Sequence, residues 1–106
     1  MPEFTGMDHV MMRSGTSYVG KVTRKKFHIA IEEIGGQIDV KTKNIIRIEF
    51  RHDYGMPLDE IVLRSASKLR GTISDEHVAF QSEELGKLNL KVAAILAIQL
   101  HSNMPF

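Results

Sequence analysis

The sequence contains no cysteine, which excludes disulfide bonds, thiolate zinc sites and cysteine nucleophiles. It also has little excess charge: 14 basic and 13 acidic residues leave a formal net charge of +1, so no overall attraction to nucleic acid or to an anionic membrane is predicted. No apolar run approaches the roughly 18 residues needed to cross a bilayer, and the longest candidate, residues 92–100, is too short. We therefore expect no membrane insertion.

A chain of 106 residues, of which 42% are hydrophobic, has the size of one small globular domain or of two very small units packed together. Residues 1–6 (MPEFTG) resemble a tag remnant or a disordered start more than the beginning of a fold. We expect a cytoplasmic location, while a periplasmic one stays open if a native signal peptide has been removed.

The two halves of the chain align with each other, which is the main feature of the sequence. Residues 8–20 (DHVMMRSGTSYVG) match residues 59–71 (DEIVLRSASKLRG) at an offset of 51, and EEIG at 32–35 matches EELG at 83–86. One extra residue near Gly36 then lowers the offset to 50 up to the end of the second copy. Apolar alternation alone does not explain these shared glycines and turn sequences, so we interpret the chain as an internal duplication.

Each half reads as five short strands separated by polar or glycine-containing turns. The strands fall near residues 10–13, 18–23, 27–31, 38–40 and 45–50, and again near 61–64, 69–73, 78–82, 88–90 and 95–100. A polar link at residues 42–44 predicts a single 3₁₀ turn before the last strand, and Ala93-Ala94 predicts a short helical turn. This is the plan of an SH3-like or Sm-like small barrel.

We therefore predict an all-β fold of two tandem five-stranded small barrels packed with pseudo-two-fold symmetry. The predicted divisions are repeat 1 at residues 7–50, a linker at 51–57, repeat 2 at 58–100 and a C-terminal tail at 101–106. Two segments also fit a helix when taken alone, residues 58–70 and 91–100, but the alignment favours strands in both. Strands can cross between the halves, and exposed sheet edges favour a homodimer.

The repeated pattern resembles bacterial proteins that carry tandem SH3-like or Sm-like small barrels, among them envelope-associated proteins. It stands here as MMRSGTSYVGKV, IEEIGGQIDV and NIIRIEF in the first half, and as VLRSASKLRGTI, SEELGKLNL and AILAIQL in the second. The resemblance implies a fold and no activity. Sm-type proteins that bind RNA have an Asp- and Asn-rich loop before the third strand, where this chain has RKK at 24–26 and DEH at 75–77, so no RNA-site residue is carried over.

No catalytic motif is present. The five histidines lack metal-ligand spacing, and the recurring Glu-Glu pairs at 32–33 and 83–84 fall on turns where neighbouring side chains point in different directions. There is no nucleophile elbow or phosphate-binding glycine loop. We expect a protein that is not an enzyme, with no cofactor and no metal site.

The halves differ in charge at one hairpin. Residues 7–50 hold eight basic and five acidic residues, whereas residues 58–100 hold five and six. Arg24, Lys25 and Lys26, with Lys43, are the candidate binding residues: they could contact phosphate, an acidic protein partner or the Asp75-Glu76 hairpin of another copy, or simply form a solvated turn.

The function expected from these features is a non-catalytic protein-interaction or scaffold module that self-associates as a homodimer or larger species. One alternative is a nucleic-acid-binding small barrel that uses Arg24, Lys25, Lys26 and Lys43, disfavoured because interleaved exposed aromatic residues are lacking. Another alternative is a soluble domain of a bacterial envelope protein.

Overall fold

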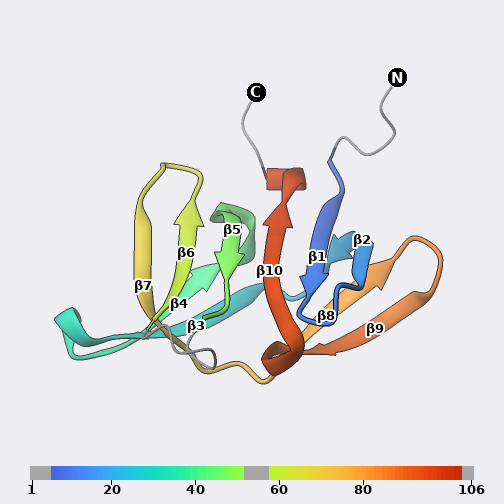
Figure 1. Ribbon diagram of the computed structural model, residues 1–106. Coiled ribbons are helices and arrows are strands. Elements are labelled where there is room, and N and C mark those ends of the chain that lie inside the picture. The colour runs from blue at the N-terminus through green and yellow to red at the C-terminus, as the bar shows by residue number, and fades with distance from the viewer. Residues whose placement is uncertain (1–5, 52–57, 104–106) are drawn as a thin grey trace.

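The computed structural model describes residues 6–51 and 58–103, and within them the regular structure is entirely strands and short 3₁₀ turns (Figure 1). The first half contains β1 Asp8–Met12, β2 Ser17–Val22, β3 Lys26–Ile31, β4 Gly36–Lys41 and β5 Ile45–Glu49. The second half contains β6 Asp59–Leu63, β7 Lys68–Ile73, β8 His77–Ser82, β9 Gly86–Lys91 and β10 Ile95–Leu100. The 3₁₀ turns are η1 Glu32–Ile34, η2 Thr42–Asn44, η4 Val92–Ala94 and η5 His101–Asn103.

The all-β prediction is confirmed, and so are the two short turns expected before the last strand of each half. The helical alternative for residues 58–70 is wrong, because β6 and β7 occupy that segment. The proposed tag-like start lies outside the described residues except for Gly6, and the proposed linker lies outside them except for Arg51. Residues 101–103, expected in the tail, form η5 and contact the sheet.

The ten strands form one antiparallel sheet that does not close, in the order β4-β3-β7-β6-β5-β10-β1-β2-β8-β9. The order is symmetric with respect to the two halves. If it is read from the β9 end and each strand is exchanged for its counterpart in the other half (β1 with β6, β2 with β7, and so on), the same order results. Figure 1 shows β5 and β10 at the centre, with the β3–β4 hairpin extending to one side and the β8–β9 hairpin to the other.

Most pairings in this sheet join one half of the chain to the other. The described strands make nine pairings, of which four are hairpins within a half: β1–β2, β3–β4, β6–β7 and β8–β9. The other five, β1–β10, β10–β5, β5–β6, β3–β7 and β2–β8, cross between the halves. Each group of five neighbouring strands therefore combines three strands of one half with two of the other.

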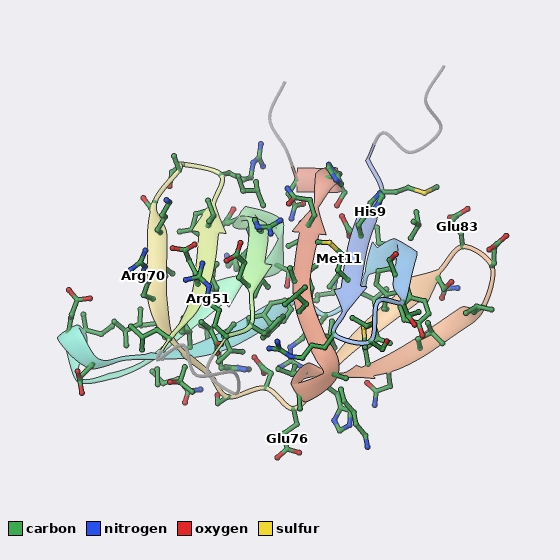
Figure 2. All side chains as sticks on the ribbon, viewed as in Figure 1. His9, Met11, Arg51, Arg70, Glu76 and Glu83 are labelled. Atoms are coloured by element: carbon green, nitrogen blue, oxygen red, sulfur yellow. The ribbon has the colours of Figure 1, made fainter. Side chains whose placement is uncertain are left out.

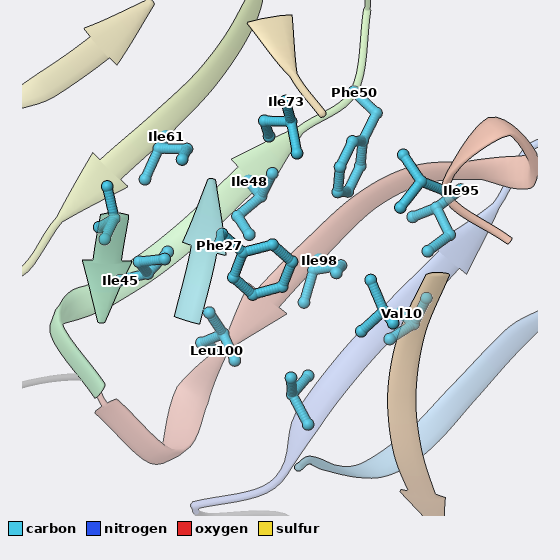
Figure 3. Close-up of a cluster of buried hydrophobic side chains, with 14 of the residues drawn as sticks. Val10, Phe27, Ile45, Ile48, Phe50, Ile61, Ile73, Ile95, Ile98 and Leu100 are labelled. Atoms are coloured by element: carbon cyan, nitrogen blue, oxygen red, sulfur yellow. The ribbon is translucent and has the colours of Figure 1, made fainter. Parts of the chain in front are cut away.

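The hydrophobic core is a single cluster shared by both halves (Figure 3). Alternating side chains of β3, Phe27, Ile29 and Ile31, are buried because one face of the strand packs inward. At the centre of the sheet Ile48 of β5 lies directly opposite Ile98 of β10, and both are completely buried. Burial of each such side chain stabilises the fold by about 1.5–3 kcal/mol. Residues of both halves are needed to form this core.

The first strand of each half begins with a buried aspartate that accepts backbone hydrogen bonds. Oδ2 of Asp8 accepts a hydrogen bond of 2.9 Å from the backbone N–H of Val22, and Oδ2 of Asp59 accepts one of 2.9 Å from Ile73. Asp8 is 1% exposed and Asp59 is fully buried, so these carboxylates need such donors. The aligned Asp residues therefore tie the first strand of each half to the end of its second strand.

Two aligned glycines mark the places where hairpins from different halves approach most closely. A Cβ added to Gly20 of β2 would lie 2.0 Å from the carbonyl oxygen of Gln81 in β8. A Cβ added to Gly71 of β7 would lie 2.1 Å from the carbonyl oxygen of Ala30 in β3. Only glycine allows these backbones to meet, and the pairings that it permits join the halves.

Candidate functional site

A cleft of about 730 Å³ lies between the β2–β3 loop, η2 and the C-terminal turn η5. The structure brings together at this cleft all four candidate residues from the sequence and adds two further lysines. The basic residues that line it are Lys21, Arg24, Lys25, Lys26, Lys41 and Lys43. We call it the cationic cleft.

Backbone hydrogen bonds hold the walls of the cationic cleft in place. The N–H of Thr42 donates to the carbonyl of Lys25 at 2.9 Å, which joins η2 to the β2–β3 loop. The side-chain amide of Asn103 donates to the carbonyls of Thr42 and Ile45, at 2.6 and 2.8 Å. The lysine side chains therefore project from a framework fixed by the main chain, and η5 forms part of that framework.

The acidic residue that lines this cleft, Asp8, has its carboxylate committed elsewhere. Besides the bond from Val22, its Oδ1 accepts hydrogen bonds from the backbone N–H and the hydroxyl of Ser102, at 3.2 and 2.7 Å. Because it is only 1% exposed and saturated with donors, Asp8 stabilises the fold and does not neutralise the lysines by direct contact.

Arg24 differs from the lysines because its guanidinium is already paired. It forms an ion pair with Asp75, and its Nε donates to the carbonyl of Lys26 at 2.6 Å. Asp75 is nearly buried, with a side chain 4% exposed, and also accepts a hydrogen bond of 2.8 Å from the backbone N–H of His28. The hypothesis that Arg24 meets Asp75 of another copy is thus corrected: the pair forms within one chain and shapes the loop.

The second half contains a counterpart cleft of about 390 Å³ at the aligned positions 73–77 and 91–93. Its backbone frame is the same, because the N–H of Val92 donates to the carbonyl of Glu76 at 2.9 Å. The charge of this counterpart cleft differs from that of the cationic cleft. Its Glu76 points outward from the sheet (Figure 2). The aligned residues in and beside the two clefts are Lys21 and Thr72, Lys25 and Glu76, Lys26 and His77, Lys41 and Lys91, and Lys43 and Ala93.

Sequence reasoning missed Lys21 and Lys41 at the cationic cleft. Both are exposed strand residues next to the turns that carry the other candidates. Their positions in the sequence could have indicated this placement, because Lys21 directly precedes the buried Val22 and Lys41 directly precedes η2. Residues on one strand face alternate with buried ones, so outward cations beside a basic turn belong to the same surface.

A second charged cluster, the ladder, joins side chains of β5, β6 and β7 to Arg51, and Figure 2 labels two of its members, Arg51 and Arg70. Glu49 accepts hydrogen bonds from Nε of Arg51 at 3.0 Å and Nε of Arg47 at 2.9 Å, and Glu60 accepts one from Nε of Arg70 at 3.2 Å. The bonds from Arg51 and Arg47 lower the pKa of the Glu49 carboxyl below its ordinary value of 4.5. Since every charge has a partner, this ladder is a structural feature.

The Glu-Glu pairs lie between the strands of the outer hairpins, as expected for turns. Glu32, Glu33, Glu83 and Glu84 are all exposed, and Glu83 lies near the tip of the β8–β9 hairpin (Figure 2). In residues 6–51 and 58–103 no group of three or more His, Asp or Glu side chains is placed to hold a metal ion. The same residues include no helix long and apolar enough to span a membrane.

Comparison with known proteins gives no relative for this arrangement. No family model matches the chain, and neither a curated protein nor a solved structure matches it.

Proposed function

We propose that the protein is a non-catalytic interaction or scaffold module, built from two duplicated small-barrel repeats that exchange strands, and that it self-associates. Two observations support the duplicated architecture. The strand order reads the same from the other end once the halves are exchanged, and the five strands at each end of the sheet comprise one first, one second, one third, one fourth and one fifth strand of a repeat. The aligned Asp8 and Asp59 also make the same hydrogen bond.

The observation that carries self-association is the open edge at each end of the sheet. Within the described residues β4 pairs only with β3, and β9 pairs only with β8. An end strand presents a row of unpaired N–H and C=O groups that can pair with a strand of another chain. Two copies can therefore extend one sheet into a larger one.

The charges along the two edges favour β4 as the contact. Asp39 and Lys41 are exposed and flank the buried Val40. If two β4 strands pair antiparallel about Val40, each Asp39 lies opposite Lys41 of the second copy, and opposite charges across strands are stabilising. The β9 edge instead carries Lys87 and Lys91 without an acidic residue, so two β9 strands repel each other. The proposed assembly is thus a two-fold dimer through β4.

Light scattering on a size-exclusion column, over a range of loading concentrations, tests this assembly. We expect a dimer that Asp39→Lys weakens by about tenfold, because two like-charge contacts replace two favourable ones. The matched control is Asn89→Lys, the aligned position on β9, which should leave the dimer unchanged. A strict monomer at the highest concentration would overturn self-association, and a dimer sensitive to Asn89→Lys but not to Asp39→Lys would overturn the β4 contact.

A further inference from the structure

We propose that the cationic cleft is a binding site for a chain of phosphate groups, which it recognises by charge and hydroxyl contacts and not by base stacking. Inorganic polyphosphate and the backbone of a single-stranded nucleic acid share this chemistry. The cleft shares Lys41 with the β4 edge, whereas Lys21, Lys25, Lys26 and Lys43 lie outside β4, and the proposal does not depend on self-association.

The first argument is that five lysines line this cleft and that four of them have no ion-pair partner among the described residues. Within the described part of the chain, Lys21, Lys25, Lys41 and Lys43 form no ion pair, and Lys26 has only a long exposed contact of 3.7 Å to Asp39. Like charges around one hollow repel each other, and a bound polyanion relieves that repulsion while releasing its own counterions. Five lysines around one cleft therefore favour a ligand with several negative charges.

The second argument is a hydroxyl that the fold itself does not need. Oγ1 of Thr42 is buried and has no hydrogen-bond partner among the described residues, an arrangement that ordinarily costs free energy. The aligned residue in the counterpart cleft is Val92, which has the same shape without the hydroxyl. Packing alone is therefore satisfied by valine, and the hydroxyl of Thr42 is a donor for a phosphate oxygen at the cationic cleft.

The third argument concerns what the cleft lacks. No aromatic side chain lies among the described residues that line it, so bases have no surface on which to stack. The lining adds the hydroxyl of Thr23 to the lysines, whereas the Ser102 hydroxyl and the Asn103 amide already donate to Asp8 and to backbone carbonyls. Charged and hydroxyl donors suit phosphate oxygens, and they leave base identity unread.

The counterpart cleft supplies matched variants that the fold already accepts. Changing Lys25→Glu, Lys26→His and Lys43→Ala together gives the cationic cleft the residues of its counterpart, all at exposed positions. The reverse set, Glu76→Lys, His77→Lys and Ala93→Lys, transfers the lysines to the second half. Arg24 and Asp75 stay unchanged in both, because they form the structural pair.

The experiment measures binding of fluorescently labelled short-chain inorganic polyphosphate by anisotropy, with a labelled single-stranded homopolymeric RNA as the second probe. We expect one site per chain, weakened at least tenfold between about 50 mM and 200 mM salt. The first variant set should reduce affinity at least tenfold, and the reverse set should raise the stoichiometry to two. Thr42→Val should reduce affinity a few-fold while leaving the melting temperature unchanged or higher.

Each result bears on the proposal separately from self-association. Equal binding by the wild type and the first variant set would overturn the site. Binding of RNA without binding of polyphosphate would overturn recognition by phosphate alone. Light scattering of the first variant set should match the wild type, so a failure of this site and a failure of the β4 contact are distinguishable.

Discussion

Arg24 and Asp75 occupy the same aligned position in the two halves of the chain, 51 residues apart, and they form an ion pair with each other. The two positions thus meet where the halves join. Opposite charges at these two positions make a contact that two identical residues could not make, since two arginines or two aspartates would repel each other.

This pair predicts that removing one partner destabilises the fold more than exchanging the two residues. Arg24→Ala leaves the nearly buried carboxylate of Asp75 without its cation and should lower the free energy of unfolding by about 2 kcal/mol. Exchanging the residues, Arg24→Asp with Asp75→Arg, should recover part of that loss, because the positions are aligned and the charges stay opposite. Urea unfolding followed by circular dichroism measures both. An exchanged variant less stable than either single charge reversal would contradict the interpretation.

The two close-approach glycines should be among the most sensitive positions. Gly20→Ala places a methyl group 2.0 Å from a backbone oxygen, which no side-chain movement can relieve, so β2 must move away from β8. We expect a loss of roughly 3 kcal/mol in the free energy of unfolding, and the same for Gly71→Ala. Gly36→Ala is the control, since nothing lies within 4 Å of its added Cβ. Thermal melts of the three variants compare them directly, and a wild-type melt for Gly20→Ala would contradict the close approach.

The turn between β6 and β7 offers a stabilising change. Ala66 has a φ of 73°, in the left-handed region that non-glycine residues avoid, whereas its aligned residue Gly15 has a φ of 97°. Ala66→Gly should therefore raise the free energy of unfolding by about 0.5–1 kcal/mol, and Gly15→Ala should lower it. Chemical denaturation midpoints of the two variants should move in opposite directions, and a shared direction would contradict the turn geometry.

Glu49 predicts a loss of stability in acid. Its pKa in the folded protein is lowered mainly by hydrogen bonds from Arg51 and then Arg47, so its ionised form stabilises the fold. That contribution is complete above the ordinary pKa of 4.5 and is lost as the pH falls through the lower folded value. Glu49→Gln should flatten this part of the stability curve by under about 1 kcal/mol, because the ladder is near the surface. Urea midpoints measured from about pH 6 to pH 3 test it, and equal acid sensitivity of both proteins would contradict it.

Strand identity could be predicted from the sequence because alternation is a local property. Phe27, Ile29 and Ile31 fix the inward face of β3, and Gly35, with a φ of 65°, ends the turn after it. Strand partners could not be predicted. The third strands of the halves, β3 and β8, have the same pattern, so the sequence allows β2 to pair with either, and in the structure it pairs with β8.

The candidate site was predicted in part for the same reason. The basic cluster can be recognised in the sequence because its members, Arg24, Lys25 and Lys26, are adjacent. The sequence could not show that the guanidinium of Arg24 is paired with Asp75, because that contact spans the halves. Nor could it show that Asn103, at the far end of the chain, forms part of the cleft wall.

The central position of β1 against β10 has a consequence for how the protein is made. Asp8 lies opposite Leu100, so the middle of the sheet joins segments separated by almost the whole chain. Hairpins such as β1–β2 can form early, but the pairing that unites them waits until residue 100 has left the ribosome. Until then β1 lacks its β10 partner and keeps an unpaired strand edge, so we expect folding to be slow and to benefit from chaperones.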